Sequence, residues 1–209
     1  MHISDGVLPL SVTIGGYAAG AVLTAWSARR TRSQDLPKVA VVTAAFFVAS
    51  LVHIPFGPTS AHLLLPGLAG ALLGPVAFLA IGLGLLLQSL LFQFGGLTAL
   101  GANSLMMGLP AMVCGWFFQT FKGRTSFRQA IVGGLSGAFG TILAAVILAV
   151  LLVTGGEDFF GVAKIALAAH VPVIIIEGIV SAFTIGFLFR VKPALLEPSF
   201  VKPVKSVHV

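Results

Sequence analysis

The sequence predicts an all-α, polytopic integral membrane protein with about seven transmembrane helices. The 209 residues are 57% hydrophobic and only 9% charged, and the mean hydropathy of +1.07 lies far above that of soluble domains. Because a helix needs about 20 apolar residues to cross ~30 Å of hydrocarbon, this length allows about six or seven spans with short loops. It leaves no room for a separate soluble domain.

Seven apolar segments follow one another along the chain. The expected spans are residues 9–28, 39–52, 63–73, 76–94, 104–121, 131–153 and 162–189. After the short third segment, Gly74-Pro75 predicts a tight turn, because proline begins helices well but interrupts them. The glycine-rich stretch 95–103 ends the fourth. We predict one membrane domain, residues 1–196, followed by a disordered cytoplasmic tail, residues 197–209.

The basic residues predict the orientation of these spans. If the N-terminus is outside and every segment crosses once, eleven of the twelve Lys and Arg residues lie on the cytoplasmic side, together with the C-terminus. Only Lys164 lies outside, beside the acidic pair Glu157-Asp158. This excess of basic residues on the cytoplasmic side is what the positive-inside rule describes. A re-entrant third segment would reverse the direction of the fourth, so the charges predict that the third segment crosses.

The amino terminus, Met1-His2, is the first candidate for chemistry. No Lys or Arg precedes the first apolar run, so we expect no cleaved signal peptide, and methionine is expected to remain before a residue as large as histidine. The terminal amine, the deprotonated amide nitrogen of His2 and its Nδ1 can then chelate one metal ion through two fused rings. Three nitrogens in one plane favour Ni²⁺ or Cu²⁺.

The histidines supply a candidate for the fourth nitrogen. In the predicted topology His2, His53 and His62 lie at the outer face and His170 lies near it, whereas His208 is in the tail. We favour His62, which follows a rigid, proline-containing loop. The alternative is that the start dipeptide has no function and that His62, like His53, is an interfacial histidine.

Few other polar side chains fall within the spans. Glu177 is the only acid deep in a span, and it lies two helical turns from His170, so the two share a face. They can pair, surround the metal site or make packing hydrogen bonds. Gln88, Gln93 and Asn103 are amides placed to order the glycine-rich loop.

The sequence argues against an enzyme. Residues 96–101 have the glycine spacing of a phosphate loop, but Ala102-Asn103 follows in place of Gly-Lys, so ATP hydrolysis by this chain is not expected. Neither a zinc-protease motif nor paired carboxylates occur. We expect no organic cofactor and, since the basic residues follow the membrane topology, no nucleic-acid partner.

Three motifs in order resemble the CbiM/NikM family over essentially the whole chain. They are MHISDGVL at residues 1–8, IPFGPTSAHL at residues 54–63, and QSLLFQFGGLT with LGAN at residues 88–103. The resemblance implies the substrate-binding S component of an energy-coupling factor importer for Ni²⁺ or Co²⁺. It also implies a metal site formed by the amine of Met1, the main-chain nitrogen and imidazole of His2, and His62.

The same resemblance implies seven helices and a set of partner proteins. The N-terminal segment is expected inside the substrate pocket, with a plug-like loop at residues 95–103. The implied partners are a membrane-embedded T component, paired cytoplasmic ATP-binding subunits and a small auxiliary membrane subunit, in the cytoplasmic membrane of a prokaryote.

Metal identity and mechanism leave alternatives. Gln93-Phe94 and Pro58 resemble the nickel branch of the family, whereas Ala99 and Ala102 resemble cobalt relatives. We favour nickel. The competing hypothesis is a self-sufficient metal channel or secondary carrier, for which His170 and Glu177 offer an ion path, although two residues make a poor relay.

Overall fold

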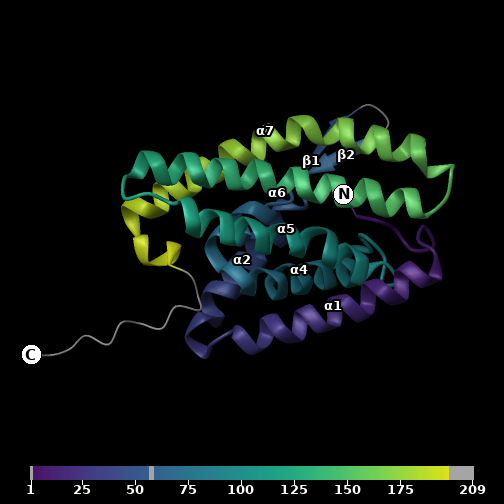
Figure 1. The fold of residues 1–209 in the computed structure, drawn as a ribbon, viewed down its shortest axis with the longest axis horizontal. Helices are drawn as coiled ribbons and strands as arrows, with labels where there is room; N and C mark the ends of the chain where they lie inside the picture. The colour runs from purple at the N-terminus through teal and green to yellow at the C-terminus, as the bar shows by residue number, and fades with distance from the viewer. Residues whose placement is uncertain (1, 57–58, 198–209) are drawn as a thin grey trace, which may run out of the picture.

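The computed structural model describes residues 2–56 and 59–197, with the side chains of all but residues 53–61. In this part of the chain seven α-helices form an elongated bundle (Figure 1). They are α1 (Leu10–Arg30), α2 (Leu36–Ala49), α3 (Pro66–Leu73), α4 (Ala77–Phe92), α5 (Leu100–Phe121), α6 (Ser126–Thr154) and α7 (Phe159–Val191). Three short 3-10 helices join them: η1 (Ser33–Asp35), η2 (Gly74–Val76) and η3 (Pro193–Leu196).

The helices keep the order of the predicted apolar segments. The largest shifts in their starts are at α5 and α6, which begin at Leu100 and Ser126, four and five residues before the expected spans. Asn103 therefore lies inside a helix. The start of α6 is fixed by Thr125, whose hydroxyl accepts a hydrogen bond from the main-chain nitrogen of Arg128 (3.3 Å), a typical N-cap.

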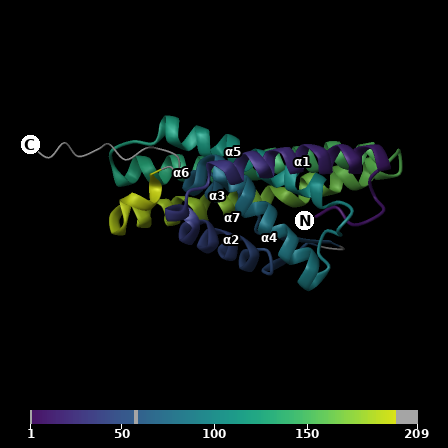
Figure 2. The same cartoon turned by 90° about the horizontal axis from the view of Figure 1, so that it is seen from below.

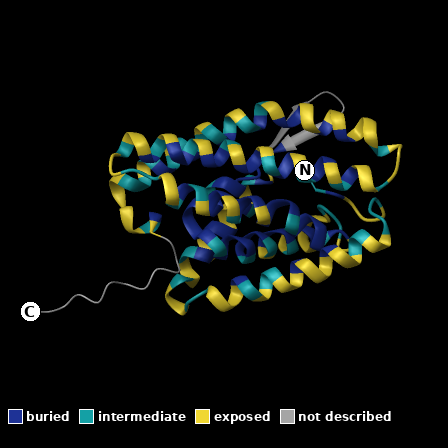
Figure 3. Ribbon diagram, viewed as in Figure 1, coloured by how far each residue is buried: buried dark blue, intermediate teal, exposed yellow. Residues whose placement is uncertain are grey.

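The outer surface of the bundle suits a lipid environment. By length and composition alone, four helical stretches can cross a membrane: Leu100–Phe121, Ser126–Thr154, Phe159–Val191 and Pro66–Phe92, the last of which comprises α3, η2 and α4 taken together. Exposed residues lie along the outside of the bundle and buried ones fill its centre (Figure 3). Many of the exposed residues are large and apolar. On α7 every fourth residue from Val171 to Phe187 is large, apolar and exposed, so these residues form an apolar stripe along one face of the helix. The helical membrane class is thus confirmed, while seven spans and the orientation stay predictions.

The two ends of the bundle differ. The end that carries residues 2–9 and the loop 93–99, where α1 starts, is called the N-terminal end (Figure 1). The opposite end, called the basic end, carries the connections after α1 and α5 and the chain beyond α7. Figure 2 shows α2 and α4 side by side on one flank. Of the predicted tail, residues 198–209 lie outside the described part.

The stretch 66–92 doubles back on itself at Gly74-Pro75, the predicted turn. Gly70 lies against the carbonyl of Ala111 and against Gly115, so that a side chain at this glycine would collide with the main chain of α5. Contacts of Gly74 with Gly115 show that α3 runs parallel to α5. In contrast, α4 is antiparallel to α5, because Phe78 faces Gly108 while Gly82 faces Ser104.

As a helix the third segment covers only part of the bundle. The eight residues of α3 rise about 12 Å, well short of a ~30 Å crossing. Residues before it form an antiparallel hairpin, β1 (His53–Phe56) with β2 (Thr59–His62), in which His53 pairs with His62. This hairpin departs from the all-α expectation. Prolines in and beside it favour extended backbone and remove helical donors.

Candidate metal centre

The N-terminal segment is held inside the bundle by one buried amide side chain. Asn103 of α5 accepts a hydrogen bond from the main-chain nitrogen of Ile3 (3.0 Å) and donates to the carbonyl of the same residue (3.0 Å). Ile3 is 2% exposed and Asn103 also 2%. These two hydrogen bonds resemble the pair that a neighbouring β-strand would make, and they satisfy both main-chain polar groups of Ile3. The residue next to it, His2, is thereby fixed in place.

The glycine-rich loop packs directly against that segment. Asn103 also donates to the carbonyl of Gly95 (2.9 Å), as predicted from its position at the loop. Gly95 has φ +79°, and a Cβ there would lie 2.6 Å from the Cβ of His2. Only glycine fits this conformation and this contact. The loop and the N-terminal segment therefore form one packed unit.

A second link joins the segment to the loop at Asp5. One carboxylate oxygen of Asp5 accepts from the main-chain nitrogen of Thr98 (2.7 Å) and from its hydroxyl. The Thr98 hydroxyl is the main reason that the pKa of Asp5 is lowered below its ordinary value, with further help from main-chain bonds of the loop. Nearby, the hydroxyl of Tyr17 donates to the carbonyl of Leu97.

His62 reaches the same place from the hairpin. Its side chain is 5% exposed, and its Nδ1 lies 3.1 Å from the carbonyl oxygen of Leu63. Because a carbonyl can only accept, this hydrogen bond places the proton on Nδ1. In a neutral imidazole, Nε2 then carries the lone pair.

Glu177 anchors the chain just beyond His62. It is fully buried near the middle of α7, where one carboxylate oxygen accepts from the main-chain nitrogens of Leu64 and of Leu65 (2.8 Å to the latter). The other oxygen accepts from the hydroxyl of Thr141 (2.6 Å). Irregular backbone at membrane depth needs such internal partners. Glu177 thus fixes the segment that carries His62.

The structure brings His2 and His62 together. Their ring centroids are 4.9 Å apart and the rings are tilted by 48°. Met1 lies outside the described residues. Three segments that are far apart in the chain meet here: residues 2–8, residues 62–65 and the loop 93–99. We call these three segments together the irregular cluster.

Other predicted candidates lie elsewhere or act differently. His170 contacts the carbonyl of Ala166 through Nδ1 (2.7 Å), so it makes a packing hydrogen bond within its own helix while Glu177 binds the segment after His62. His53 lies in β1, but its side chain is outside the described part, as is His208. Within the described residues, no group of three or more His, Cys, Asp and Glu side chains could hold a metal.

Gln88 of α4 and Gln93, which follows that helix, contribute less to the order of the loop than predicted. Gln93 ends the helix in a left-handed conformation with φ +56°, and the main-chain carbonyl of Gln88 accepts from the nitrogen of Phe94 (3.3 Å). The side chain of Gln88 is fully buried and, in the described structure, neither of its polar atoms has a hydrogen-bond partner. Of the three amides, Asn103 is the one whose side chain orders the loop.

Sequence reasoning missed the partners of one positioning residue, Glu177, and missed a second residue, Asp5, altogether. The lone intramembrane acid signalled Glu177 as a functional residue, but its partners are main-chain amides that no motif marks. Asp5 gave no signal, since an acid before a glycine is usually a turn residue. Chemically, the described residues offer two neighbouring imidazoles and no cluster of carboxylates, which suits a nitrogen-binding transition metal better than Mg²⁺ or Ca²⁺.

Comparison with known proteins places this geometry in context. Residues 2–195 match the family described as CbiM, cobalt uptake substrate-specific transmembrane region. A relative from Haemophilus influenzae, named for metal transport, is 34% identical over 199 residues, which are 94% of this chain and 97% of that protein. The fused nickel transport protein NikMN of Rhodobacter capsulatus is 33% identical over 234 residues, covering 100% of this chain and 67% of that protein. A crystal structure of a transition metal transporter superposes with a TM-score of 0.73 at 26% identity, over 91% of this chain and 93% of that one.

Proposed function

This chain belongs to the CbiM family of cobalt uptake transmembrane proteins, and on that premise we propose that it is the substrate-capturing membrane subunit of an ATP-dependent energy-coupling factor importer. Nickel is the substrate we favour and cobalt the alternative. The protein is located in the cytoplasmic membrane of a prokaryote. The chain acts as a single membrane domain, residues 1–196, and as a transport subunit, not an enzyme.

The proposal rests on the approach of His2 to His62. With metal–nitrogen bonds of ~2 Å, two imidazoles at neighbouring corners of a square have ring centres about 4.5 Å apart. The observed separation is 4.9 Å. His2 would bind through Nδ1, within the two fused rings that include its own amide nitrogen and the amine of Met1. His62 would then complete a plane of four nitrogens.

The surroundings of His62 support its role as the fourth ligand. Metal-binding histidines usually donate their second ring N–H to a carbonyl or a carboxylate, which fixes the tautomer. The Nδ1 contact with Leu63 supplies that bond and leaves Nε2 for the metal. Asn103 and Glu177 act as positioning residues, since each fixes the chain beside one of the two histidines.

Partner subunits would supply the energy. The sequence contains no complete phosphate-binding loop, so we propose paired cytoplasmic ATP-binding subunits that act through a membrane-embedded T component, with a small auxiliary membrane subunit. The N-terminus faces outside and the C-terminus faces the cytoplasm in this proposal. Metal would then be captured at the N-terminal end and released toward the basic end.

An inserted residue tests the chelate most directly. An alanine placed between Met1 and His2 breaks the fused five- and six-membered rings, so stoichiometric Ni²⁺ binding by the purified protein in titration calorimetry should be lost. An alanine inserted after Gly156, in a turn where a side chain would meet no neighbour, is the control and should bind normally. Full Ni²⁺ binding by the first variant would refute the site.

The competing carrier hypothesis is tested separately. Liposomes that contain this chain alone should not accumulate Ni²⁺, whereas liposomes that also contain the T component and ATP-binding subunits should do so with ATP. Uptake by the chain alone, driven by an ion gradient, would favour a secondary carrier that uses His170 and Glu177. The contact of His170 with its own helix argues against that path.

A further inference from the structure

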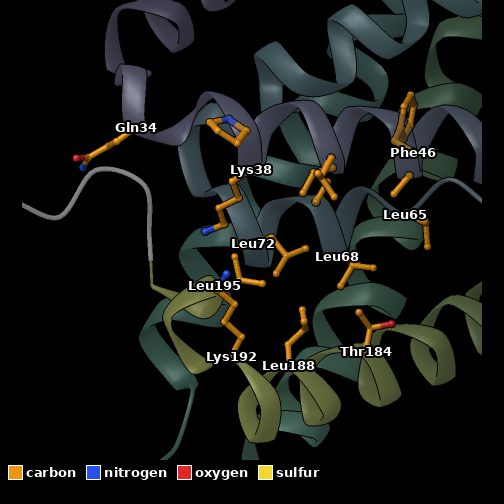
Figure 4. Close-up of a pocket in the computed structure, with 15 residues that line it drawn as sticks. Gln34, Lys38, Phe46, Leu65, Leu68, Leu72, Thr184, Leu188, Lys192 and Leu195 are labelled. Atoms are coloured by element: carbon orange, nitrogen blue, oxygen red, sulfur yellow. The ribbon is translucent and has the colours of Figure 1, made fainter.

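A large apolar groove runs from Leu65, at the edge of the irregular cluster, toward the basic end. Its volume is about 610 Å³, in the range of ligand pockets. Residues from α2 and α7 form its walls and residues from α3 form its floor (Figure 4). Phe46, Leu65, Leu68, Leu72 and Leu188 lie along it, and none of its lining residues is acidic.

Two lysines stand at one end of this groove. Lys38 comes from α2 and Lys192 from the residue that follows α7, and both belong to the lining. Figure 4 shows their amino groups pointing toward one another, whereas Phe46 and Leu65 mark the other end. Lys38 also donates to the main-chain carbonyl of Glu197 (3.0 Å), which fixes the position of its ammonium group.

The combination of a long apolar slot and paired ammonium groups matches the chemistry of a phospholipid. Apolar side chains can take an acyl chain, with a gain that grows with each buried methylene. Basic pockets between membrane helices attract anionic lipid headgroups. A free anion would gain nothing from the apolar part of the groove, and an uncharged chain would gain nothing from the lysines.

We propose that the groove between α2, α3 and α7 binds one acyl chain of an anionic glycerophospholipid, whose phosphate lies between Lys38 and Lys192. The lipid would fill the space where α2 and α7 stand apart over α3. Its headgroup would lie at the basic end of the bundle, where the lysines and arginines of the connecting segments gather. This inference does not depend on the proposed metal site.

Native mass spectrometry of the full chain in detergent tests the proposal. Phosphatidylglycerol and phosphatidylcholine with the same acyl chains are added in equal amounts, and the retained adducts are compared. Wild-type protein should retain phosphatidylglycerol preferentially. Since each lysine near an anionic headgroup changes binding about fivefold, the double variant K38Q/K192Q should lose at least that much of the preference.

Matched controls separate the site from general charge effects. The variant K164Q/R124Q removes the same net charge at residues outside the groove and should keep the wild-type preference. Leu188→Trp fills the slot while both lysines remain, and it should reduce retention of phosphatidylglycerol. Circular dichroism and a single elution peak confirm that each variant is folded.

Three results would overturn the proposal. The first is equal retention of both lipids by the wild type, and the second is an unchanged preference in K38Q/K192Q. The third is displacement of phosphatidylglycerol by millimolar inorganic phosphate, which would show a simple anion site without an acyl subsite. Failure of phosphate to compete, together with sensitivity to Leu188→Trp, supports the lipid.

Discussion

The pair α6–α7 and the irregular cluster are held together in different ways. Along α6 and α7 small residues let the helices approach: Gly133 lies against Ile185, and Gly137 lies against Ser181 and the carbonyl of Glu177. Packing of this kind spreads the stabilisation over many weak contacts. In the irregular cluster, by contrast, the side chains of Asn103, Asp5 and Glu177 hold the main chain by specific hydrogen bonds. We therefore expect single substitutions to affect the cluster far more than the helix pair.

Glu177 belongs to both regions, so its substitution should have the largest effect. Glu177→Ala removes the acceptor of Leu64, Leu65 and Thr141. The Thr141 hydroxyl keeps the carbonyl of Gly137 as an acceptor, but the two main-chain donors are orphaned, at about 1–3 kcal/mol each. We expect a lower unfolding temperature and a loss of Ni²⁺ affinity of about 100-fold, because the chain after His62 is released. Thermal unfolding and titration calorimetry measure the two effects.

Thr141→Val is the matched control for Glu177. It removes the Thr141 hydroxyl and its contacts with Glu177 and with the carbonyl of Gly137. The main-chain bonds of Glu177 to Leu64 and Leu65 stay intact. Ni²⁺ affinity should stay within about threefold of wild type, since we expect the free energy of metal binding to change by less than ~1 kcal/mol. If Thr141→Val weakens binding as much as Glu177→Ala, Glu177 does not act through the segment after His62.

Asn103→Ala should produce the next largest effect, confined to the N-terminal segment. The main-chain groups of Ile3 lose their partners, at about 1–3 kcal/mol for a buried donor. We expect at least tenfold weaker Ni²⁺ binding and faster amide exchange at residues 2–8, with exchange in α6 and α7 unchanged. Ser104→Ala, at the next buried position of α5, should leave both unchanged. Equal exchange at residues 2–8 in wild type and Asn103→Ala would contradict the proposed role.

Gly95→Ala tests the close approach of the loop to His2. Alanine at φ +79° is strained, and its Cβ would collide with the Cβ of His2, so we expect a cost of about 1–3 kcal/mol and about tenfold weaker metal binding. Gly6→Ala is the control, because Gly6 has the same φ of +79° but no atom near its missing Cβ. A loss of similar size in both variants would attribute the effect to backbone strain alone.

The contrast between the two regions also explains what the sequence could predict. Apolar runs marked all seven helices in order, and Gly74-Pro75 marked the reversal between α3 and α4, because local composition encodes these features. His2 and His62 were selected by chelate chemistry, and the structure places them side by side. The bonds of Glu177 to Leu64 and Leu65 could not be foreseen, since main-chain donors are the same in every residue. The β1–β2 hairpin was not predicted, because its proline-containing sequence is also typical of a loop.

The smallest effect is expected at Asp5, on the exposed rim of the cluster. Its pKa is lowered, first by the Thr98 hydroxyl, so the charged form is bound better in the folded state. The contribution of this bond is therefore present above the unfolded pKa of about 4 and is lost as the pH falls through the lower folded value. Asp5→Asn should raise amide exchange at residues 93–99 slightly at pH 6.

A pH series gives this last prediction its sharpest form. The difference in exchange between wild type and Asp5→Asn should be constant from about pH 7 to pH 5. It should shrink below about pH 4, as the pH falls from the unfolded pKa toward the lower pKa of the folded state. A difference that stays the same at pH 3 would mean that the charge of the Asp5 carboxylate does not join the N-terminal segment to the loop.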